Sequence, residues 1–175
     1  MKLYSIENFL TDKECDKIIA HIDEYNEPSR VSNDDLIDGG LEYVYRNSTT
    51  SNLYDNIIPN LRQRIADELQ IQNLKKGEGL QGQKYEPGQY FKSHTDFFEG
   101  EAYQSNCLTS GNRTHTLMIY LNEDFEGGQT YYEDTTTIKP VLGRGLFFNG
   151  VFYKHGVNKV EKNTRYVVAT WYKNT

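Results

Sequence analysis

Three residues of the sequence have the types and the spacing expected of metal ligands. His94 and Asp96 form a His-x-Asp pair in FKSHTDFF, and His155 lies far along the chain in KHGVNKV. Residues i and i+2 of an extended strand project to the same face, so the imidazole of His94 and the carboxylate of Asp96 would reach a common point. Adding His155 gives two imidazoles and one carboxylate, a set that holds non-haem Fe(II) and leaves coordination positions open. The pattern therefore predicts an iron site.

Each of these residues also has a simpler interpretation. A His-x-Asp tripeptide is common by chance, and His94 could be an exposed strand histidine in a salt bridge with Asp96. His155 could be a turn residue. His21 lies beside polar residues on a predicted helix, and we interpret it as a solvated surface side chain. The prediction of a metal site therefore depends on the residues that accompany these three.

Arg165 is the most informative of the accompanying residues. It lies ten residues after His155, in NTRYVVATWY. The planar guanidinium group can bind a carboxylate through two charge-assisted hydrogen bonds, and the distal carboxylate of 2-oxoglutarate is such a group. The alternative is a surface arginine that pairs with one of the 25 acidic residues. The apolar neighbours Val167, Val168 and Trp171 favour a buried strand instead.

Two helices, followed by many short strands, must position these residues. Thr11 and Glu14 form a capping-box pattern, which predicts a helix from about Thr11 to Tyr25. Apolar residues at helical spacing predict a second helix that ends near Leu69. Turn signals then separate the candidate strands. The predicted strands are Leu41–Tyr45, Leu80–Tyr85, Tyr90–His94, Thr114–Leu121, Gln129–Tyr132, Arg144–Asn149, His155–Val157 and Arg165–Tyr172.

This order of elements predicts a mainly β domain of the α+β class, in which helices pack on one side of a β-sandwich or jelly roll. A chain of 175 residues suits one domain. We expect a single domain over residues 1–175, with a helical N-terminal support over about 1–76 and a jelly-roll core over about 77–175.

Charge and hydropathy exclude several classes of partner. The net charge of −6 argues against binding to nucleic acid or to an anionic membrane surface. No stretch has the apolar length of a signal peptide or of a membrane span, so we expect a soluble cytoplasmic protein without a membrane partner. Cys15 and Cys107 lie far apart, and we interpret them as two free thiols.

Four blocks of sequence, in this order, resemble the prolyl 4-hydroxylase-like 2-oxoglutarate/Fe(II) oxygenases. They are YEPGQYFKSHTD, RTHTLMIYLNEDFEGGQTYY, IKPVLGRGLFFN and HGVNKVEKNTRYVVATW, and they cover the chain from about Leu80 to Tyr172. The resemblance implies a double-stranded β-helix (jelly-roll) core with the N-terminal helices packed on one sheet. It also implies that His94, Asp96 and His155 are the iron ligands.

The resemblance gives roles to further residues near the iron. Arg165 matches the basic residue that binds the distal carboxylate of 2-oxoglutarate. Tyr85 matches a tyrosine that hydrogen-bonds near the other end of the co-substrate, and Tyr120 matches a tyrosine that assists the arginine.

Strand parity extends this assignment. If Tyr120 faces the pocket, Met118 and Thr116 share its face, and His115 points away from the metal. On the last strand, Trp171 shares the face of Arg165 by the same rule. We therefore include Met118 and Trp171 among the residues that line the co-substrate pocket, although ordinary core packing explains Trp171 equally well.

The activity implied by the resemblance is hydroxylation with Fe(II), 2-oxoglutarate and O2, releasing succinate and CO2, with ascorbate as a candidate reductant. The implied substrate is a prolyl residue of a polypeptide, hydroxylated at C4. The same chemistry on a free amino acid, another small molecule or a nucleobase is the alternative, although the acidic balance weighs against nucleic acid. A non-catalytic jelly-roll binding module is the alternative of a different class. The oligomeric state stays open.

Two further features have two interpretations each. The segment Phe97–Asn112 follows the His-x-Asp pair directly and mixes aromatic residues with Gly, Ser and Asn, so it is either a substrate lid or a mobile surface loop. Arg46, in YRNSTTS, resembles an arginine on the substrate side of the family site. A surface salt bridge is the other interpretation, and we favour it slightly.

Overall fold

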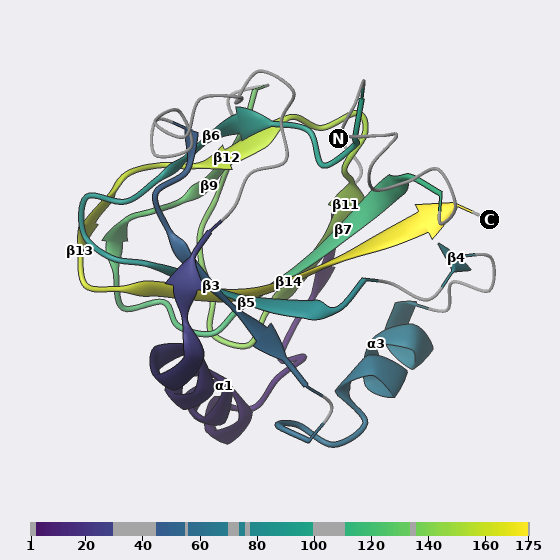
Figure 1. The fold of residues 1–175 in the computed structure, drawn as a ribbon, viewed down its shortest axis with the longest axis horizontal. Coiled ribbons are helices and arrows are strands. Elements are labelled where there is room, and N and C mark those ends of the chain that lie inside the picture. Colours follow the sequence, from purple (N-terminus) through teal and green to yellow (C-terminus); the bar gives the residue numbers. More distant parts are fainter. Residues whose placement is uncertain are drawn as a thin grey trace.

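The fold consists of two facing β-sheets with helices on one outer side (Figure 1). It comes from a computed structural model that describes residues 3–29, 45–54, 56–69, 74–75, 78–99, 111–133 and 136–174. All strand pairs in these ranges are antiparallel. The strand expected over Leu41–Tyr45 lies outside the described residues except for its last one, and Cys107 also lies outside them.

Helix α1 spans Asp12–Tyr25 and confirms the predicted capping box. The backbone N–H of Thr11 donates to Glu14 Oε2 over 2.9 Å, and the backbone N–H of Glu14 donates back to Thr11 Oγ1 over 3.3 Å. These bonds satisfy two donors that a helix start otherwise leaves unpaired. Cys15 is a free thiol on the buried face, and burial together with nearby acidic residues raises its pKa to about 12.

Helix α3 spans Leu61–Leu69 and ends where the periodicity predicted. Arg64 connects it to the start of α1, because its guanidinium bonds both Glu14 and the carbonyl oxygen of Phe9. None of the helices among the described residues is both long and apolar enough to cross a bilayer.

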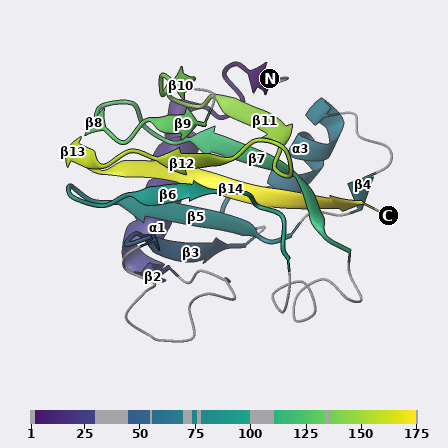
Figure 2. The same ribbon diagram turned by 90° about the horizontal axis from the view of Figure 1, so that it is seen from above.

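The major sheet has the order β1-β11-β7-β14-β5-β3-β2, with β4 pairing β14, as can be followed from β11 to β3 in Figure 2. Its strands are β1 (Leu3–Ile6), β2 (Glu27–Pro28), β3 (Thr49–Leu53), β4 (Leu74–Lys75), β5 (Leu80–Tyr85), β7 (Arg113–Tyr120), β11 (Gly145–Asn149) and β14 (Arg165–Asn174).

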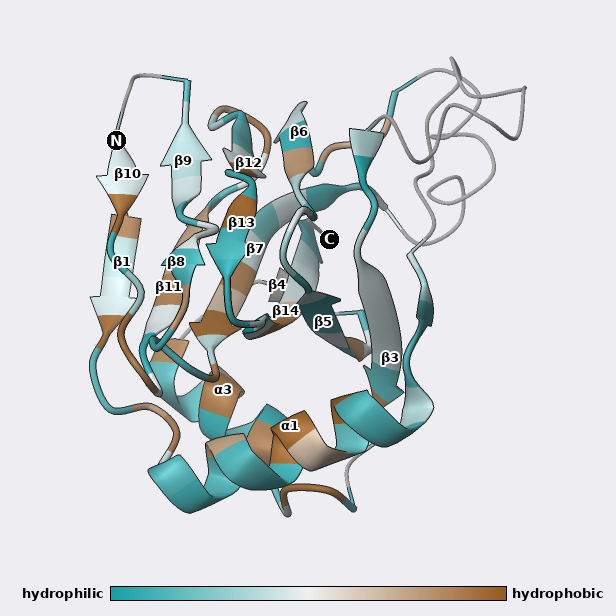
Figure 3. Ribbon diagram, turned by 90° about the vertical axis from the view of Figure 1, so that its left-hand side faces the viewer, coloured by the Kyte–Doolittle hydropathy of each residue, from teal (hydrophilic) through white to brown (hydrophobic). Residues whose placement is uncertain are grey.

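The minor sheet has the order β10-β9-β12-β6 and lies on the side of the major sheet away from the helices (Figures 1 and 3). Its strands are β6 (Phe91–His94), β9 (Thr130–Tyr132), β10 (Thr137–Ile138) and β12 (His155–Val157), and a separate pair joins β8 (Glu126–Gly127) to β13 (Val160–Lys162). The expected mainly β jelly-roll core with N-terminal helices on one sheet is therefore confirmed.

The first part of the chain is not only a helical support. It adds β1 to one edge of the major sheet, beside β11, and β3 to the other, beside β5. Short polar segments such as TTSNL show little alternation of their own, and they become strands because an existing sheet edge offers unpaired backbone groups.

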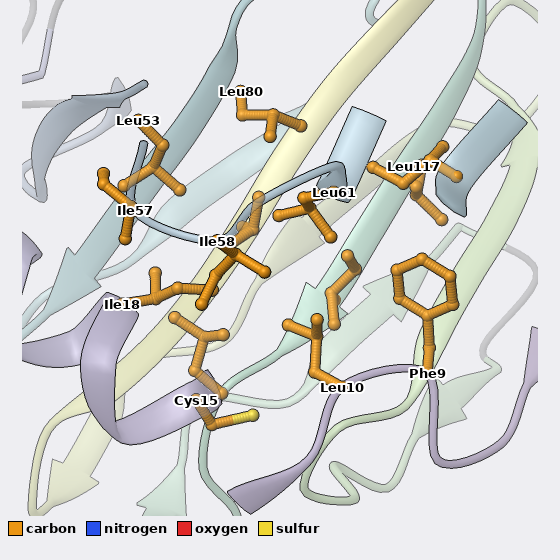
Figure 4. Packing of buried hydrophobic residues seen from close by; sticks show 14 of the residues in the cluster. Phe9, Leu10, Cys15, Ile18, Leu53, Ile57, Ile58, Leu61, Leu80 and Leu117 are labelled. Carbon is orange, nitrogen blue, oxygen red and sulfur yellow. The ribbon is translucent and has the colours of Figure 1, made fainter. Parts of the chain in front are cut away.

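The apolar core lies between the helices and the major sheet (Figure 4). Ile18 and Ile22 of α1 are fully buried, and Leu117 and Ile119 of β7 face the same cluster. Gly82 of β5 allows this close approach, since a Cβ there would lie 2.5 Å from Ile22 Cγ1. Helix α1 covers this face of the sheet (Figure 3), and its buried residues Ile18 and Ile22 belong to the apolar cluster there, so this face is closed and leaves the chemistry to the opposite one.

Candidate metal and co-substrate site

The three predicted metal ligands meet in the structure. His94 ends β6 and His155 begins β12, and the two residues are direct partners across the antiparallel pair. Asp96 follows two residues after His94. His155 Nε2 lies 3.5 Å from Asp96 Oδ2, and His94 Nε2 lies 3.7 Å from Asp96 Oδ1. One ligand atom from each residue lies within 4.8 Å of the other two, which suits a single ion.

Backbone carbonyl groups orient both imidazoles. His94 Nδ1 lies 2.9 Å from the carbonyl oxygen of Lys92, and His155 Nδ1 lies 3.0 Å from that of Tyr153. A carbonyl oxygen only accepts hydrogen bonds, so each Nδ1 carries a proton, and in the neutral form of each ring Nε2 keeps the free lone pair. Both lone pairs are therefore available on the side of Asp96, as metal binding requires.

Asp96 is buried and is held by neighbouring strands. Thr116 of β7 donates a hydrogen bond from Oγ1 to Asp96 Oδ2, and the backbone N–H of Asp96 donates to the carbonyl oxygen of Gly150 over 3.1 Å. A Cβ at Gly150 would lie 2.8 Å from Thr116 Oγ1 and 3.1 Å from Asp96 Cβ. Glycine at this position therefore lets the backbone approach the carboxylate, and Thr116 fixes one of its oxygens.

The surroundings of Asp96 and His155 favour the protonation states in which these residues bind a metal. Burial works against the charged form of Asp96, but His155, His94 and Thr116 together hold the pKa of the carboxyl well below its usual range. Burial lowers the pKa of His155 to about 4, although Asp96 opposes this shift. At neutral pH the site thus offers one carboxylate and a neutral His155, and two nitrogens with one oxygen suit ferrous iron.

Arg165 is the largest fully buried side chain among the described residues. Its Cζ lies 5.0 Å from the centre of the Tyr85 ring and 5.6 Å from that of Tyr120. Its Nη2 donates to Thr130 Oγ1 over 3.1 Å and lies 3.5 Å from Met118 Sδ. Nε and Nη1 have no hydrogen-bond partner in the part of the chain that the structure describes.

An unpaired buried guanidinium is costly, and an anion compensates that cost. The two unpartnered nitrogens of Arg165 therefore fit a carboxylate group, as the distal end of 2-oxoglutarate would supply. Tyr85 connects Arg165 to the metal ligands through Phe91. It packs in one buried cluster with Phe91, and the Phe91 ring stacks on His94 at 3.8 Å between centroids.

Thr130 is a residue of this pocket that the sequence did not indicate. It accepts hydrogen bonds from both Tyr120 Oη, at 2.8 Å, and Arg165 Nη2. Tyr120 thus assists Arg165 through a shared partner. A threonine at the start of a short strand carries no distinguishing pattern, so only the arrangement of β9 beside β7 and β14 could have revealed it.

Strand parity places the remaining residues of β7. Met118 and Tyr120 belong to one buried cluster with Val167 on the pocket face, whereas Leu117 and Ile119 belong to the helix-side core. His115 is turned away from the metal, and its ring stacks on Phe147 at 5.2 Å between centroids. It therefore takes no part in the metal group.

Trp171 shares the strand face of Arg165 but lies near the other end of β14. It is six residues along β14, roughly 20 Å at the rise of a strand, and its partner on β7 is Thr116. The guanidinium of Arg113 stacks on its ring at 3.9 Å and binds Glu78 through Nε and Nη2 at 2.9 and 2.5 Å. Trp171 therefore stands beside the support of Asp96 and not beside the predicted carboxylate site.

Arg46 corrects one interpretation. The interpretation of Arg46 as a residue in a surface salt bridge is wrong. Arg46 is only 6% exposed, and its Nε donates to Ser48 Oγ over 2.7 Å. Its guanidinium lies over the rings of Phe91, at 4.8 Å, and Tyr85, at 5.9 Å. Arg46 is thus one aromatic ring away from the metal ligand His94. The sequence could not show this, because the position depends on an isolated β-bridge to Phe91.

Two other expectations meet the structure only in part. His21 is half-buried rather than fully solvated, and its Nε2 lies 3.0 Å from the carbonyl oxygen of Asn52.

Of the candidate lid Phe97–Asn112, residues 100–110 lie outside the described ranges. At its ends, the side chain of Asn112 bonds both the N–H and the C=O of Phe98, at 3.0 and 2.6 Å.

Comparison with known proteins agrees with this site. The family model described as the 2OG-Fe(II) oxygenase superfamily matches residues 80–173, more than half of the chain. Prolyl 4-hydroxylase 2 of Arabidopsis thaliana is 30% identical over 135 residues, which are 76% of this chain and 44% of that protein. Probable prolyl 4-hydroxylase 3 of the same plant is 33% identical over 130 residues, which are 71% of this chain and 43% of that protein. The chain thus spans less than half the length of these relatives.

Solved structures share the fold over the whole chain. The 2OG complex of the viral collagen prolyl hydroxylase from Paramecium Bursaria Chlorella virus-1 matches with a TM-score of 0.73 and 24% identity, covering 100% of this chain and 97% of the other. A Trichoplax adhaerens prolyl hydroxylase, in complex with a hypoxia inducible factor peptide fragment, matches with a TM-score of 0.76 and 16% identity, covering 98% and 83%. With the family match and the fold together, the chain belongs to the 2OG-Fe(II) oxygenase superfamily.

Proposed function

We propose that this chain is a 2-oxoglutarate- and O2-dependent Fe(II) hydroxylase that acts on prolyl residues of a polypeptide and releases succinate and CO2. One observation carries the proposal. The group His94, Asp96 and His155 and the side chain of Arg165 contact the same face of β7, through Thr116 and Met118 respectively. Nε and Nη1 of Arg165 are buried without a partner among the described residues. A metal group and an anion site together are what this co-substrate requires.

Each residue has a task that its contacts support. His94, Asp96 and His155 would hold the iron, and Thr116 keeps the Asp96 carboxylate in place. Bound iron, with 2-oxoglutarate and O2, supplies the oxidising chemistry that transfers oxygen to a C–H bond. Arg165 binds the distal carboxylate, and the buried walls around it exclude water, which strengthens the charge interaction.

The substrate class rests on the relatives and on two buried donors near the metal ligands. The curated relatives are named prolyl 4-hydroxylases, and one similar structure holds a peptide. In this chain, Arg46 Nη2 and Trp171 Nε1 are buried donors without a partner in the described ranges. A polypeptide offers carbonyl oxygens as acceptors for such donors, whereas the net charge of −6 disfavours an oligonucleotide.

The test is succinate formation with Fe(II), 2-oxoglutarate and O2, with and without ascorbate, in the presence of one candidate substrate at a time. The candidates are a proline-containing peptide, free proline and an alkylated oligonucleotide. We expect the peptide to stimulate succinate formation and to gain one oxygen atom by mass spectrometry. Asp96→Ala is the inactive control.

The result that would overturn the substrate assignment is stimulation by free proline or by the oligonucleotide without stimulation by the peptide. Absence of 2-oxoglutarate binding to the metal-loaded protein would overturn the oxygenase itself and leave a binding module.

A further inference from the structure

Three side chains on the pocket face of β5 form a hydrogen-bonded chain. Gln81, Gln83 and Tyr85 alternate along the strand and therefore share one face. Tyr85 Oη donates to Gln83 Oε1 over 3.3 Å, and Gln83 Nε2 donates to Gln81 Oε1 over 3.1 Å. Gln81, at the outer end, is half-buried, while Tyr85, at the inner end, has no exposed surface.

Gln83 is in an unusual place for a glutamine. It is only 8% exposed, and its neighbours across the sheet are Val167 on β14 and Thr50 on β3. Burying a carboxamide costs free energy unless both its ends are bonded, and an apolar side chain would fill the same space without that cost. Here both ends are bonded, so the side chain is fixed and in turn fixes the hydroxyl of Tyr85.

The two tyrosines that flank Arg165 are anchored in different ways. Tyr120 donates to Thr130, and Thr130 also accepts from Arg165, so on this side of the guanidinium the three residues are joined by two hydrogen bonds. On the other side, Tyr85 is anchored by Gln83 alone among the hydrogen bonds of the described residues. The wall formed by Tyr85 therefore depends on a residue that touches neither the metal group nor Arg165 in any described contact.

We propose that Gln83 is a positioning residue for the co-substrate: it holds the hydroxyl of Tyr85, whose ring lies over the guanidinium of Arg165, and so sets the affinity for 2-oxoglutarate. The proposal rests on the proposed function. A pocket whose polar groups are already fixed binds its ligand more tightly, because less order must be imposed on binding. Loss of one such neutral hydrogen bond corresponds to about 1 kcal/mol, or about a fivefold change in affinity.

The experiment measures binding without turnover. Mn(II) replaces iron, and 2-oxoglutarate is titrated calorimetrically into the wild type and into Gln83→Met, Tyr85→Phe and the double variant, with the Mn(II) affinity measured separately. We expect Gln83→Met to weaken 2-oxoglutarate binding about fivefold while Mn(II) binding is unchanged. If Gln83 acts through the hydroxyl, adding Gln83→Met to Tyr85→Phe weakens binding no further.

Two matched controls use other glutamines. Gln81→Met removes a partner of Gln83 but not of Tyr85, so its effect should be smaller than that of Gln83→Met. Gln63→Met, on α3, removes a hydrogen bond to Asp67 and should leave 2-oxoglutarate affinity unchanged. A melting temperature for every variant separates general destabilisation from a specific loss of affinity.

Three outcomes overturn the inference. They are unchanged or tighter 2-oxoglutarate binding in Gln83→Met, no effect of Tyr85→Phe, and equal weakening by Gln83→Met with or without the Tyr85 hydroxyl. A wild type that binds Mn(II) but not 2-oxoglutarate would instead overturn the proposed function, and this inference with it.

Discussion

The two faces of the major sheet are built from the same strands and have opposite characters. On β7, Leu117 and Ile119 point into the apolar cluster under α1, whereas Thr116 and Tyr120 point into the pocket. On β14, Arg165 is buried on the pocket face with two unpartnered nitrogens among the described residues.

The difference shows how one strand serves stability and chemistry at once. Because side chains alternate, each strand can pack every second residue against the helices for stability and present the residues between them to a ligand. The pocket face keeps buried polar groups that only a ligand would satisfy, and the helix face supplies the apolar burial that offsets their cost. Substitutions on the two faces should therefore have separable effects.

The largest effect should follow loss of a metal ligand. We expect His94→Ala, Asp96→Ala and His155→Ala each to abolish turnover and to lower iron content after dialysis far below one ion per chain, because each removes one of three ligands. His115→Ala is the matched control, since His115 stacks on Phe147 away from the group. Loss of iron from His115→Ala would refute the parity argument.

Loss of Arg165 should be the next largest effect. Removing one partner of a buried charge pair typically costs ~2–5 kcal/mol, so Arg165→Ala should raise the half-saturating 2-oxoglutarate concentration well over tenfold. Iron binding should survive, since no ligand is touched. Arg165→Lys should recover only part of the affinity, because an ammonium group cannot reproduce two parallel hydrogen bonds.

Succinate formation against 2-oxoglutarate concentration provides the measurement for all three proteins. An unchanged half-saturation in Arg165→Ala would mean that another residue binds the co-substrate.

A substitution on the helix face should lower the stability of the protein and leave its affinity for 2-oxoglutarate unchanged. Ile119 is fully buried there, so Ile119→Ala should lower the free energy of unfolding by roughly 2–5 kcal/mol in urea titrations. The folded variant should bind 2-oxoglutarate as the wild type does, because its neighbours Met118 and Tyr120 are unchanged. A large loss of co-substrate affinity in the folded variant would show that the two faces are coupled.

The smallest effect should come from Glu78, at the edge of the pocket face. Burial opposes its charge, but the hydrogen bonds from Arg113 hold the pKa of Glu78 below its usual value. A lowered pKa in the folded state stabilises the protein above the pKa of the unfolded state, and this contribution disappears as pH falls through the folded-state pKa. Wild type should therefore be more stable than Glu78→Gln at pH 7.

The measurement is urea unfolding of both proteins from pH 7 downward into the acid range. We expect the difference between them to shrink on acidification. A difference that stays constant with pH would mean that the charge of Glu78 contributes nothing.

The sequence predicted the elements with a pattern of their own. The capping box of α1 and the apolar residues Val167, Val168 and Trp171 of β14 are local signals, and the structure has both elements close to their expected bounds. His94 and Asp96 were also predicted as a pair from their i, i+2 spacing. In the structure β6 ends at His94, and Asp96 lies two residues beyond the strand.

Contacts set by pairing between strands could not be predicted. Thr130 reaches Arg165 because β9 lies against the pocket, and Arg46 is buried because a single bridge joins it to Phe91. Gln83 gave no signal either, since an alternating polar residue usually marks a solvent-facing side chain. Strand β1 was not predicted for a similar reason. It is only four residues long, and it becomes a strand because it pairs with the edge strand β11.

The bonds between Asn112 and Phe98 have a consequence for substitutions in the segment between them. They join the two ends of the intervening segment as a clasp, and Arg113 stacks on the Phe98 ring at 4.4 Å to reinforce it. Changes of length or sequence inside the clasp need not propagate to Asp96, which precedes it, or to β7, which follows it. Substitutions between Phe98 and Asn112 should therefore leave the iron ligands in place.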